Sequence, residues 1–208
     1  MINNKYIAIE GAIGVGKTTL AQSISNTMKC QTLFEDYGDN PFLKKFYDEN
    51  QTNSFSTQLY FLLKRIEQSE KINRTDDMLI SDFYFGKDEL FARLNLSEIE
   101  YQMYNSIKNK LNFIPPVPDL IIYLQASSDI LMERVRKRGL DIERRIKKEY
   151  IESVNNIYMK HFHEYKDSPV LIINTSNVNI NNKDDYQMLI REISSDINGK
   201  KYFNPASI

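Results

Sequence analysis

The sequence predicts an α/β fold in which a five-stranded parallel sheet carries helices on both faces. Short apolar runs rich in β-branched and aromatic residues alternate with longer stretches of helical periodicity. A glycine-rich loop joins the first apolar run to the first helical stretch. The chain has 208 residues, 41% of them hydrophobic, which suits one compact domain over residues 1–208. Strands that alternate with helices form parallel sheets through right-handed crossovers.

Five segments are predicted strands because each is short, apolar and bounded by polar or turn-forming residues. They are Tyr6–Glu10, Thr32–Glu35, Met78–Asp82, Leu120–Leu124 and Val170–Asn174. The predicted helices are Lys17–Lys29, Pro41–Tyr47, Ser54–Ile72, Ser97–Asn112, Ser128–Arg138, Lys147–His163 and Asp184–Ile197. The final residues, about 203–208, are expected to form a loose tail.

Residues 11–19 read GAIGVGKTT and match the phosphate-loop pattern G-x-x-x-x-G-K-[ST]. The motif predicts that these nine residues hold the phosphates of ATP or GTP: Gly11, Ala12, Ile13, Gly14, Val15, Gly16, Lys17, Thr18 and Thr19. The glycines allow backbone N–H groups to turn inward, Lys17 supplies positive charge, and the Thr18 hydroxyl is placed to ligate Mg²⁺. A strand before the loop and a helix after it favour this interpretation over a chance glycine turn.

Composition narrows the possible functions. A net charge of −1 argues against a general nucleic-acid binder, which needs a basic excess. Cys30 is the single cysteine, so the chain has no intramolecular disulfide and no Cys-rich metal site. The sequence shows no signal segment and no apolar run long enough to span a bilayer, so we expect a cytoplasmic protein that does not bind membranes.

Three acidic residues lie near the carboxyl ends of predicted strands. Glu35 closes the second strand, Asp82 closes the third, and Glu143 follows the basic helix after the fourth. Ligands of parallel α/β sheets bind beyond these strand ends. A carboxylate there can act as a base for a hydroxyl or hold Mg²⁺, although any one of them alone could equally be a helix cap or a solvated loop acid.

Several spaced motifs resemble the deoxynucleoside kinase family, and most closely its bacterial deoxyguanosine and deoxyadenosine kinase branch. They are the phosphate loop, FEDYGDNPFLKKFYDE, FSTQLYFLLKR and RVRKRG, within a similarity from about Tyr6 to Tyr158. The resemblance implies a P-loop kinase fold with an arginine-rich lid at about 134–145. It also implies that Glu35 is the base for the nucleoside 5′-hydroxyl and that Tyr47 binds the sugar 3′-hydroxyl.

Further site residues follow from the same resemblance. Gln58 and Arg65 are seven residues apart, so they share one helix face, and the family uses that face to read the base; the alternative is a pair of ordinary surface polar residues. Arg134 and Arg138 correspond to lid arginines that stabilise the transferring phosphate, or else to a solvated basic helix end. Glu143 corresponds to a second 3′-hydroxyl contact, while Leu140 stands where many members have another arginine.

The segment after the third strand departs from the family pattern. Most members read Asp/Glu-Arg-Ser, with the acid on Mg²⁺ and the arginine bridging phosphate and base, whereas this chain reads Asp82-Phe83-Tyr84. Asp82 keeps the metal role, and an aromatic residue at Phe83 resembles the deoxyguanosine kinases, which favours guanine; ordinary core packing is the alternative. In the FGKDELFA segment, Phe91 matches an aromatic that stacks on the base, and either Lys87 or Asp88 faces the base.

The expected activity is transfer of the ATP γ-phosphoryl group, with Mg²⁺, to the 5′-hydroxyl of a purine deoxynucleoside in nucleotide salvage, with deoxyguanosine favoured. Three alternatives stay open: a deoxyadenosine/deoxycytidine kinase, a thymidylate-like monophosphate kinase, and a catalytically silent nucleotide-binding regulator. Family members pair through helices near residues 97–112, so a homodimer is expected. That stretch is rich in apolar and aromatic residues: Ile99, Tyr101, Met103, Tyr104 and Ile107.

Overall fold

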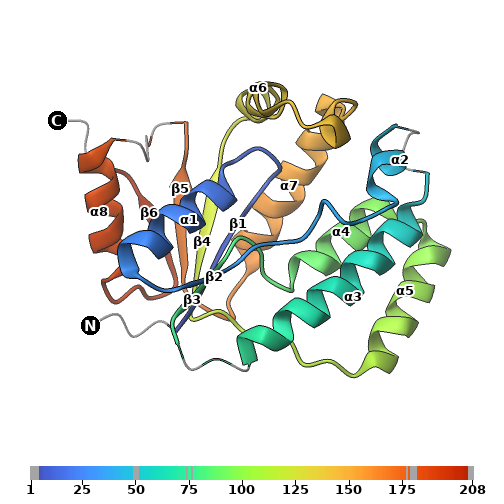
Figure 1. Ribbon diagram of the computed structural model, residues 1–208, viewed down its shortest axis with the longest axis horizontal. Coiled ribbons are helices and arrows are strands. Elements are labelled where there is room, and N and C mark those ends of the chain that lie inside the picture. Colours follow the sequence, from blue (N-terminus) through green and yellow to red (C-terminus); the bar gives the residue numbers. More distant parts are fainter. Residues whose placement is uncertain are drawn as a thin grey trace.

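A six-stranded, fully parallel sheet forms the centre of the computed structural model (Figure 1). The structure describes residues 5–48, 52–73, 75, 77–176, 178 and 182–205. The strands are β1 (Tyr6–Gly11), β2 (Gln31–Leu33), β3 (Leu79–Ser81), β4 (Leu120–Gln125), β5 (Val170–Asn174) and β6 (Lys200–Phe203), in the spatial order β2-β3-β1-β4-β5-β6. The predicted α/β class is confirmed, but the predicted count of five strands is wrong.

Strand β1 lies in the middle of the sheet and every one of its residues is buried. Ile7 pairs with Ile80 of β3 on one side and with Leu120 of β4 on the other. Strands covered on both faces read as continuous apolar runs, as β1 and β4 do. This register brings the carboxyl ends of β1, β3 and β4 to the same edge of the sheet.

Helices cover both faces of the sheet (Figure 1). They are α1 (Lys17–Met28), α2 (Leu43–Asp48), α3 (Ser54–Asn73), α4 (Lys87–Asn95), α5 (Glu98–Leu111), α6 (Ser128–Arg138), the 3₁₀ turn η1 (Asp141–Glu143), α7 (Lys148–Glu164) and α8 (Lys183–Ile193). On one side, α1 and α8 lie together, joined by a hydrogen bond from the Tyr186 hydroxyl to the Ser23 carbonyl. On the other side, α3, α4, α5 and α7 form the larger layer. No described helix has the length and apolarity needed to cross a membrane.

Three elements were absent from the sequence prediction: helix α4, the 3₁₀ turn η1 and strand β6. Helix α4 follows β3 after a short turn, and its first turn carries Asp88 and Glu89, which favour a helix start. Strand β6 ends at Phe203, the first residue of the predicted tail, and this residue is buried. Its sequence, KKYF, carries little strand signal because its edge position leaves most of it exposed. Residues 206–208 of the predicted tail lie outside the described part of the chain.

The phosphate loop takes the backbone conformation that its glycines permit. Gly11 and Gly16 have φ angles of 145° and 105°, which residues with a Cβ rarely adopt. A Cβ at Gly11 would lie 2.4 Å from the Leu124 carbonyl oxygen, whereas one at Gly16 would meet nothing within 4 Å. The loop backbone is therefore packed closely against β4 at Gly11, whereas at Gly16, where α1 begins, there is free space beside it.

This difference predicts unequal losses of stability on substitution by alanine. We expect Gly16→Ala to cost about 1–2 kcal/mol of backbone strain. Gly11→Ala should be the more damaging substitution, because it adds a clash with the β4 backbone to the same strain. We expect the melting temperature of the Gly11→Ala variant to fall by roughly 10 °C. Gly38→Ala is the matched control, because a Cβ there meets nothing within 4 Å. Equal melting temperatures for the Gly11 and Gly16 variants would contradict this view of the loop.

Candidate active site

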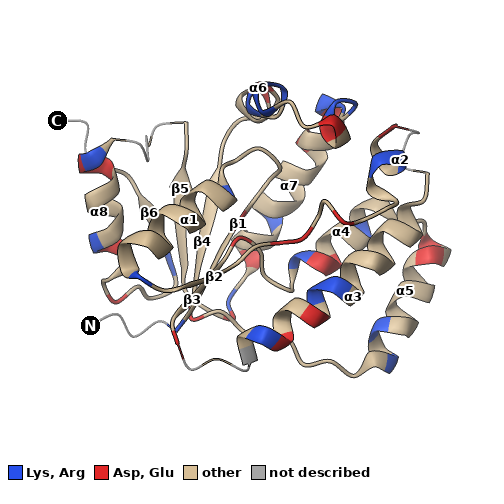
Figure 2. Ribbon diagram, viewed as in Figure 1, with Lys and Arg blue, Asp and Glu red and all other residues tan. Residues whose placement is uncertain are grey.

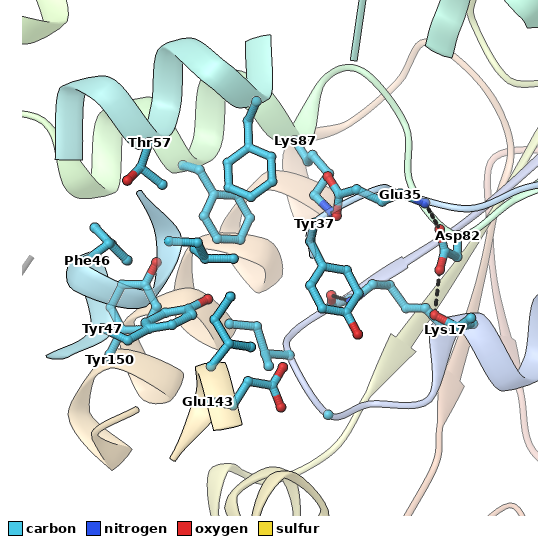
Figure 3. A pocket seen from close by; sticks show the side chains of 18 of the residues that line it. Lys17, Glu35, Tyr37, Phe46, Tyr47, Thr57, Asp82, Lys87, Glu143 and Tyr150 are labelled. Carbon is cyan, nitrogen blue, oxygen red and sulfur yellow. Dashed lines mark hydrogen bonds and ion pairs between the residues drawn. The ribbon is translucent and has the colours of Figure 1, made fainter. Parts of the chain in front are cut away.

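A cavity of about 340 Å³ opens at the carboxyl edge of the sheet (Figure 3). Lys17 and Asp82 lie at one end of it, which we call the phosphate end. Phe46, Tyr47, Thr57 and Tyr150 lie at the other, which we call the acceptor end. Glu35 and Lys87 lie between the two ends in Figure 3. The structure therefore brings the predicted phosphate loop and most of the predicted acceptor residues to one cavity.

At the phosphate end, Lys17 reaches back over its own loop. Its Nζ donates hydrogen bonds to the carbonyl oxygens of Gly11 at 2.8 Å and Ala12 at 3.2 Å. Burial lowers the pKa of Lys17, and the positive charge of Lys87 lowers it further. The loop thus holds its lysine beside the backbone that would surround a phosphate.

Asp82 connects the phosphate loop to Glu35. The Thr18 hydroxyl donates to Asp82 Oδ2 at 2.5 Å, and the Glu35 backbone N–H donates to Asp82 Oδ1 at 2.7 Å (Figure 3). A hydroxyl and a carboxylate oxygen in contact are hard ligands of the kind that Mg²⁺ uses together with phosphate oxygens and water. No group of three or more acidic, His or Cys side chains suited to a metal occurs among the described residues. Thr18 and Asp82 therefore fit a cation that takes most of its ligands from elsewhere.

Five charged side chains form a row along the cavity: Glu10, Lys87, Glu35, Arg65 and Asp88. Lys87, Glu35 and Arg65 line the cavity, and the other two lie behind them. Lys87 Nζ lies 2.7 Å from Glu35 Oε2 and 3.9 Å from Glu10 Oε1. Arg65 contacts Glu35 Oε1 through Nε at 2.9 Å and Nη2 at 2.8 Å, and its Nη1 bonds Asp88 Oδ1. Negative and positive groups alternate along the row, so each buried charge has an opposite neighbour.

The row sets the ionisation of Glu35. Burial favours the neutral carboxyl, but Lys87 and Arg65 together outweigh it and lower the pKa of Glu35 to about 2. For Asp88, burial prevails over Arg65 and raises the pKa. Glu35 is consequently a carboxylate at any pH near neutrality.

Gln58 and Arg65 share one face of α3, as their spacing predicts. Gln58 donates its amide N–H₂ to the Asp88 backbone oxygen and to Asp88 Oδ1, both at 3.0 Å. This fixes the amide so that its oxygen is the atom able to accept a hydrogen bond from a ligand. Arg65 stacks on Phe61 and uses its guanidinium on the two acids, which makes it a support for Glu35 as well as a lining residue.

Two residues predicted as base contacts lie outside the cavity lining. Phe83 is fully buried in the protein interior. Its ring therefore packs in the core, which was the alternative to a contact with the base. Asp88 is also fully buried, and its carboxylate bonds Arg65, Gln58 and the Tyr104 hydroxyl. Of the two candidates Lys87 and Asp88, Lys87 is the one that lines the cavity, and Phe91 lines it as well.

Aromatic rings and one acid form the acceptor end. Tyr47 packs edge to face against Phe46 and Tyr150, with ring centroids 5.2 and 6.0 Å away. Burial is the main cause that raises the pKa of Tyr47, so its hydroxyl is a neutral donor. Glu143 of η1 lies below these rings in Figure 3 and accepts a 3.1 Å hydrogen bond from Arg138 Nε.

The predicted lid begins within a basic helix, α6, which is rich in Lys and Arg in Figure 2. Its two candidate arginines have different partners. Arg134 donates to Thr175 Oγ1 at 2.9 Å, to the Thr175 carbonyl at 3.0 Å and to the Val15 carbonyl at 3.4 Å. Arg138 is about 40% exposed and bonds only one acid, Glu143, in the part of the chain described. Arg134 thus braces the phosphate loop, and Arg138 is the freer of the two.

The sequence prediction missed several residues that line the cavity or lie next to its lining. Glu10 is fully buried and accepts hydrogen bonds from Gly11 N at 3.1 Å, Tyr84 N at 3.0 Å and the Tyr158 hydroxyl at 2.8 Å. Thr57 lines the acceptor end, and its buried hydroxyl has no hydrogen-bond partner in the described structure. Thr57 could have been predicted to lie near the site, because it directly precedes Gln58 in the sequence. Tyr150 carried no comparable signal, because its place beside Tyr47 arises only on folding.

Comparisons with known proteins agree with this arrangement. The family model for deoxynucleoside kinase matches residues 7–198. The chain is 36% identical over 157 residues to a Bacillus subtilis deoxyguanosine kinase, covering 74% of this chain and 76% of that protein. It is 26% identical to a deoxyadenosine/deoxycytidine kinase of the same organism, covering 92% and 93% of the two chains. A solved structure of M. mycoides deoxyadenosine kinase with bound dATP superposes with a TM-score of 0.79 at 25% identity, covering 92% of this chain and all of that one.

The low pKa of Glu35 predicts how stability depends on pH. A carboxyl whose pKa falls from 4.5 to about 2 on folding stabilises the protein above the higher value, and this stability disappears as the pH falls towards the lower one. Between pH 5 and pH 3 the free energy of unfolding should fall by about 2 kcal/mol more in the wild type than in Glu35→Gln. Denaturant titrations at both pH values measure this difference.

The control for this titration is Asp36→Asn, which removes the exposed carboxylate next to Glu35 in the chain. We expect it to keep the wild-type pH dependence, because solvent screens an exposed charge. Parallel curves for the wild type and Glu35→Gln would show that Lys87 and Arg65 do not hold Glu35 as an ion.

Proposed function

The chain belongs to the deoxynucleoside kinase family, and from this premise we propose that it transfers the ATP γ-phosphoryl group to the 5′-hydroxyl of a purine deoxynucleoside, with deoxyguanosine preferred. One observation carries the proposal. The ionised Glu35 carboxylate lies between the phosphate end and the acceptor end of a single cavity. A general base must lie within hydrogen-bond distance of the attacking hydroxyl, and that hydroxyl must face the phosphorus. A carboxylate between the two ends of the cavity meets both requirements.

Glu35 accepts the 5′-hydroxyl proton in this mechanism. The hydroxyl oxygen attacks the γ phosphorus in line with the departing ADP, and charge spreads over the equatorial oxygens. A carboxylate with a low pKa is a weak base, so it takes the proton late, when bond formation has already made the hydroxyl acidic. The main contributions of the protein are positioning and neutralisation of charge.

The phosphate end provides that neutralisation. The loop N–H groups and Lys17 would surround the β and γ phosphates. Arg138, which is partly exposed at the edge of the cavity, can rotate towards them. Thr18 and Asp82 would hold Mg²⁺, which supplies a further positive charge when bound. Asp82 also fixes the Glu35 backbone, so the metal site and the base are kept at a constant separation.

The acceptor end would bind the nucleoside. Tyr47 and Glu143 are the predicted partners of the sugar 3′-hydroxyl, one as donor and the other as acceptor. The Gln58 oxygen can accept from a base N–H, and Phe91 offers a ring to stack on. The preference for deoxyguanosine is supported by the deoxyguanosine kinase relative at 36% identity.

A monophosphate kinase is the competing function, since a probable thymidylate kinase of Archaeoglobus fulgidus is 31% identical over 72% of this chain and 82% of its own length. An acceptor phosphate needs cations beside it. The acceptor end instead holds Glu143 and tyrosines. The cations near it are paired with acids, Arg65 with two of them and Arg138 with Glu143. An uncharged hydroxyl acceptor fits these groups better.

ATP-dependent phosphorylation of the four natural deoxynucleosides and of thymidylate, measured side by side at equal concentration, tests the proposed function. We expect turnover of deoxyguanosine above deoxyadenosine, and both well above thymidylate. A preference for deoxycytidine or deoxyadenosine would contradict the specificity but keep the mechanism. Turnover of thymidylate alone, or of nothing, would overturn the proposed function.

Glu35→Gln keeps the shape of the base but removes its ability to accept a proton. We expect kcat to fall about 10²–10⁴-fold, the range typical of general bases, while the KM for ATP changes little. Asp36→Asn serves as the control and should keep wild-type turnover. Wild-type kcat in Glu35→Gln would show that another group receives the proton.

We also propose that the protein is a homodimer that pairs through α5. Ile99 and Met103 are 73% and 53% exposed on this helix, and Leu63 of α3 is exposed as well. Tyr104, predicted with them, is instead buried between α3 and α4. Light scattering should give twice the chain mass for the wild type and a monomer for Ile99→Glu/Met103→Glu. A monomeric wild type would contradict the proposal.

A further inference from the structure

Lys87 is a buried lysine for which the mechanism above has no role. It begins α4, its side chain is 4% exposed, and it lines the cavity between the phosphate end and the acceptor end. Burying an ammonium group is costly unless it is paired. A lysine in this position therefore has a specific partner or a specific task.

Its nearest partner is the proposed base. Lys87 Nζ bonds Glu35 Oε2 at 2.7 Å, while both Arg65 contacts fall on the other oxygen, Oε1. Glu35 is thus already held by Arg65 without the help of Lys87. In the described structure, Oε2 is the carboxylate oxygen that carries only one contact, and it is the one from which a partner can most easily withdraw to admit a hydroxyl.

A second anchor places Lys87 beside the phosphate loop. Its Nζ lies 3.9 Å from Glu10 Oε1, and Glu10 accepts a hydrogen bond from Gly11 N, the first N–H of the loop. Lys17 Nζ bonds the carbonyl oxygen of the same glycine. Lys17 of α1 therefore contacts the first residue of the loop directly, whereas Lys87 of α4 is linked to it through Glu10.

We propose that Lys87 is a second catalytic lysine, which holds Glu35 before the reaction and then neutralises the transferring phosphoryl group. The inference rests on the proposed kinase function. As the 5′-O–H bond breaks, its proton goes to Glu35 Oε2; the O5′–P bond forms, and the bond to ADP breaks with its electron pair on ADP. The protonated Glu35 no longer attracts the ammonium group, so the negative phosphoryl oxygens become its partner.

The residue that directly follows Asp82 carries no positive charge. Phe83 stands at that position and is buried in the core, so the β3 end provides no cation to the cavity. Lys87 brings a cation to the cavity from the first turn of the next helix, four residues later. It is therefore assigned to phosphate chemistry rather than to base recognition.

Steady-state kinetics of Lys87→Met and Lys87→Arg test this role. Met has a similar length without charge, so kcat should fall about 100-fold, as when one group that stabilises transition-state charge is lost. The KM for the deoxynucleoside and the ranking of the four bases should not change. Lys87→Arg should recover most of the lost kcat. Lys71→Met, an exposed lysine on α3, is the control and should behave as the wild type.

A double variant separates phosphate stabilisation from a purely structural hold on Glu35. The Glu35→Gln variant has already lost the ion pair between Lys87 and residue 35. In this background, Lys87→Met should still lower kcat by roughly tenfold or more. No further loss there, or a raised nucleoside KM with altered base ranking at normal kcat, would overturn the inference. Each variant is compared at temperatures below its own melting point.

A binding measurement covers the case in which Lys87→Met folds poorly or turns over too slowly. Lys87→Gln retains polarity, and its affinity for ADP alone should match the wild type. Its affinity for ADP with aluminium fluoride and deoxyguanosine, which mimics the transferring phosphoryl group, should fall about 100-fold. Equal losses for both ligands would overturn the inference.

An inactive wild type would overturn the proposed function and this inference together. An active wild type whose Lys87 variants are equally active would overturn this inference alone.

Discussion

The site depends on keeping one largely buried carboxylate, that of Glu35, ionised and fixed between the two ends of a cavity. Burial alone would neutralise it, and two cations from different helices prevent this. Removing one partner of a buried ion pair typically costs about 3–5 kcal/mol, because the other charge stays buried. Glu35, Arg65 and Lys87 consequently constrain one another. Helices α3 and α4 place Arg65 and Lys87 beside Glu35 at the edge of the sheet.

The same carboxylate links the two halves of the proposed reaction. Its backbone N–H is fixed by Asp82, which also bonds Thr18 of the phosphate loop, so the donor side sets its position. Its side chain is held by Arg65, which reaches Asp88 and, through it, the Gln58 amide at the acceptor end. Donor and acceptor sites are thus joined by a continuous set of short polar contacts, which gives the orientation that in-line transfer requires.

Local patterns were sufficient to predict the phosphate loop, the parallel class and most helices, because these depend on residues close in the chain. Gln58 and Arg65 were correctly placed on one face of α3 by their spacing. The ionic partners of Arg65 were missed because Glu35 and Asp88 come from other elements and meet it only after folding. Phe83 could not be assigned for a related reason, since the turn after β3 decides whether its ring enters the cavity or the core. Strand β6 was missed because a short edge strand with two lysines carries little periodic signal.

A crystal structure with deoxyguanosine and a non-hydrolysable ATP analogue would test the central claim most directly. The account predicts that the nucleoside 5′-oxygen lies within about 3 Å of a Glu35 carboxylate oxygen and faces the γ phosphorus held by the loop. It predicts in addition that Arg65 still bonds the other oxygen of Glu35. A 5′-hydroxyl bound to a different side chain, with Glu35 still enclosed by Lys87 and Arg65 on both oxygens, would contradict the account, because the proposed base would then be only a structural ion.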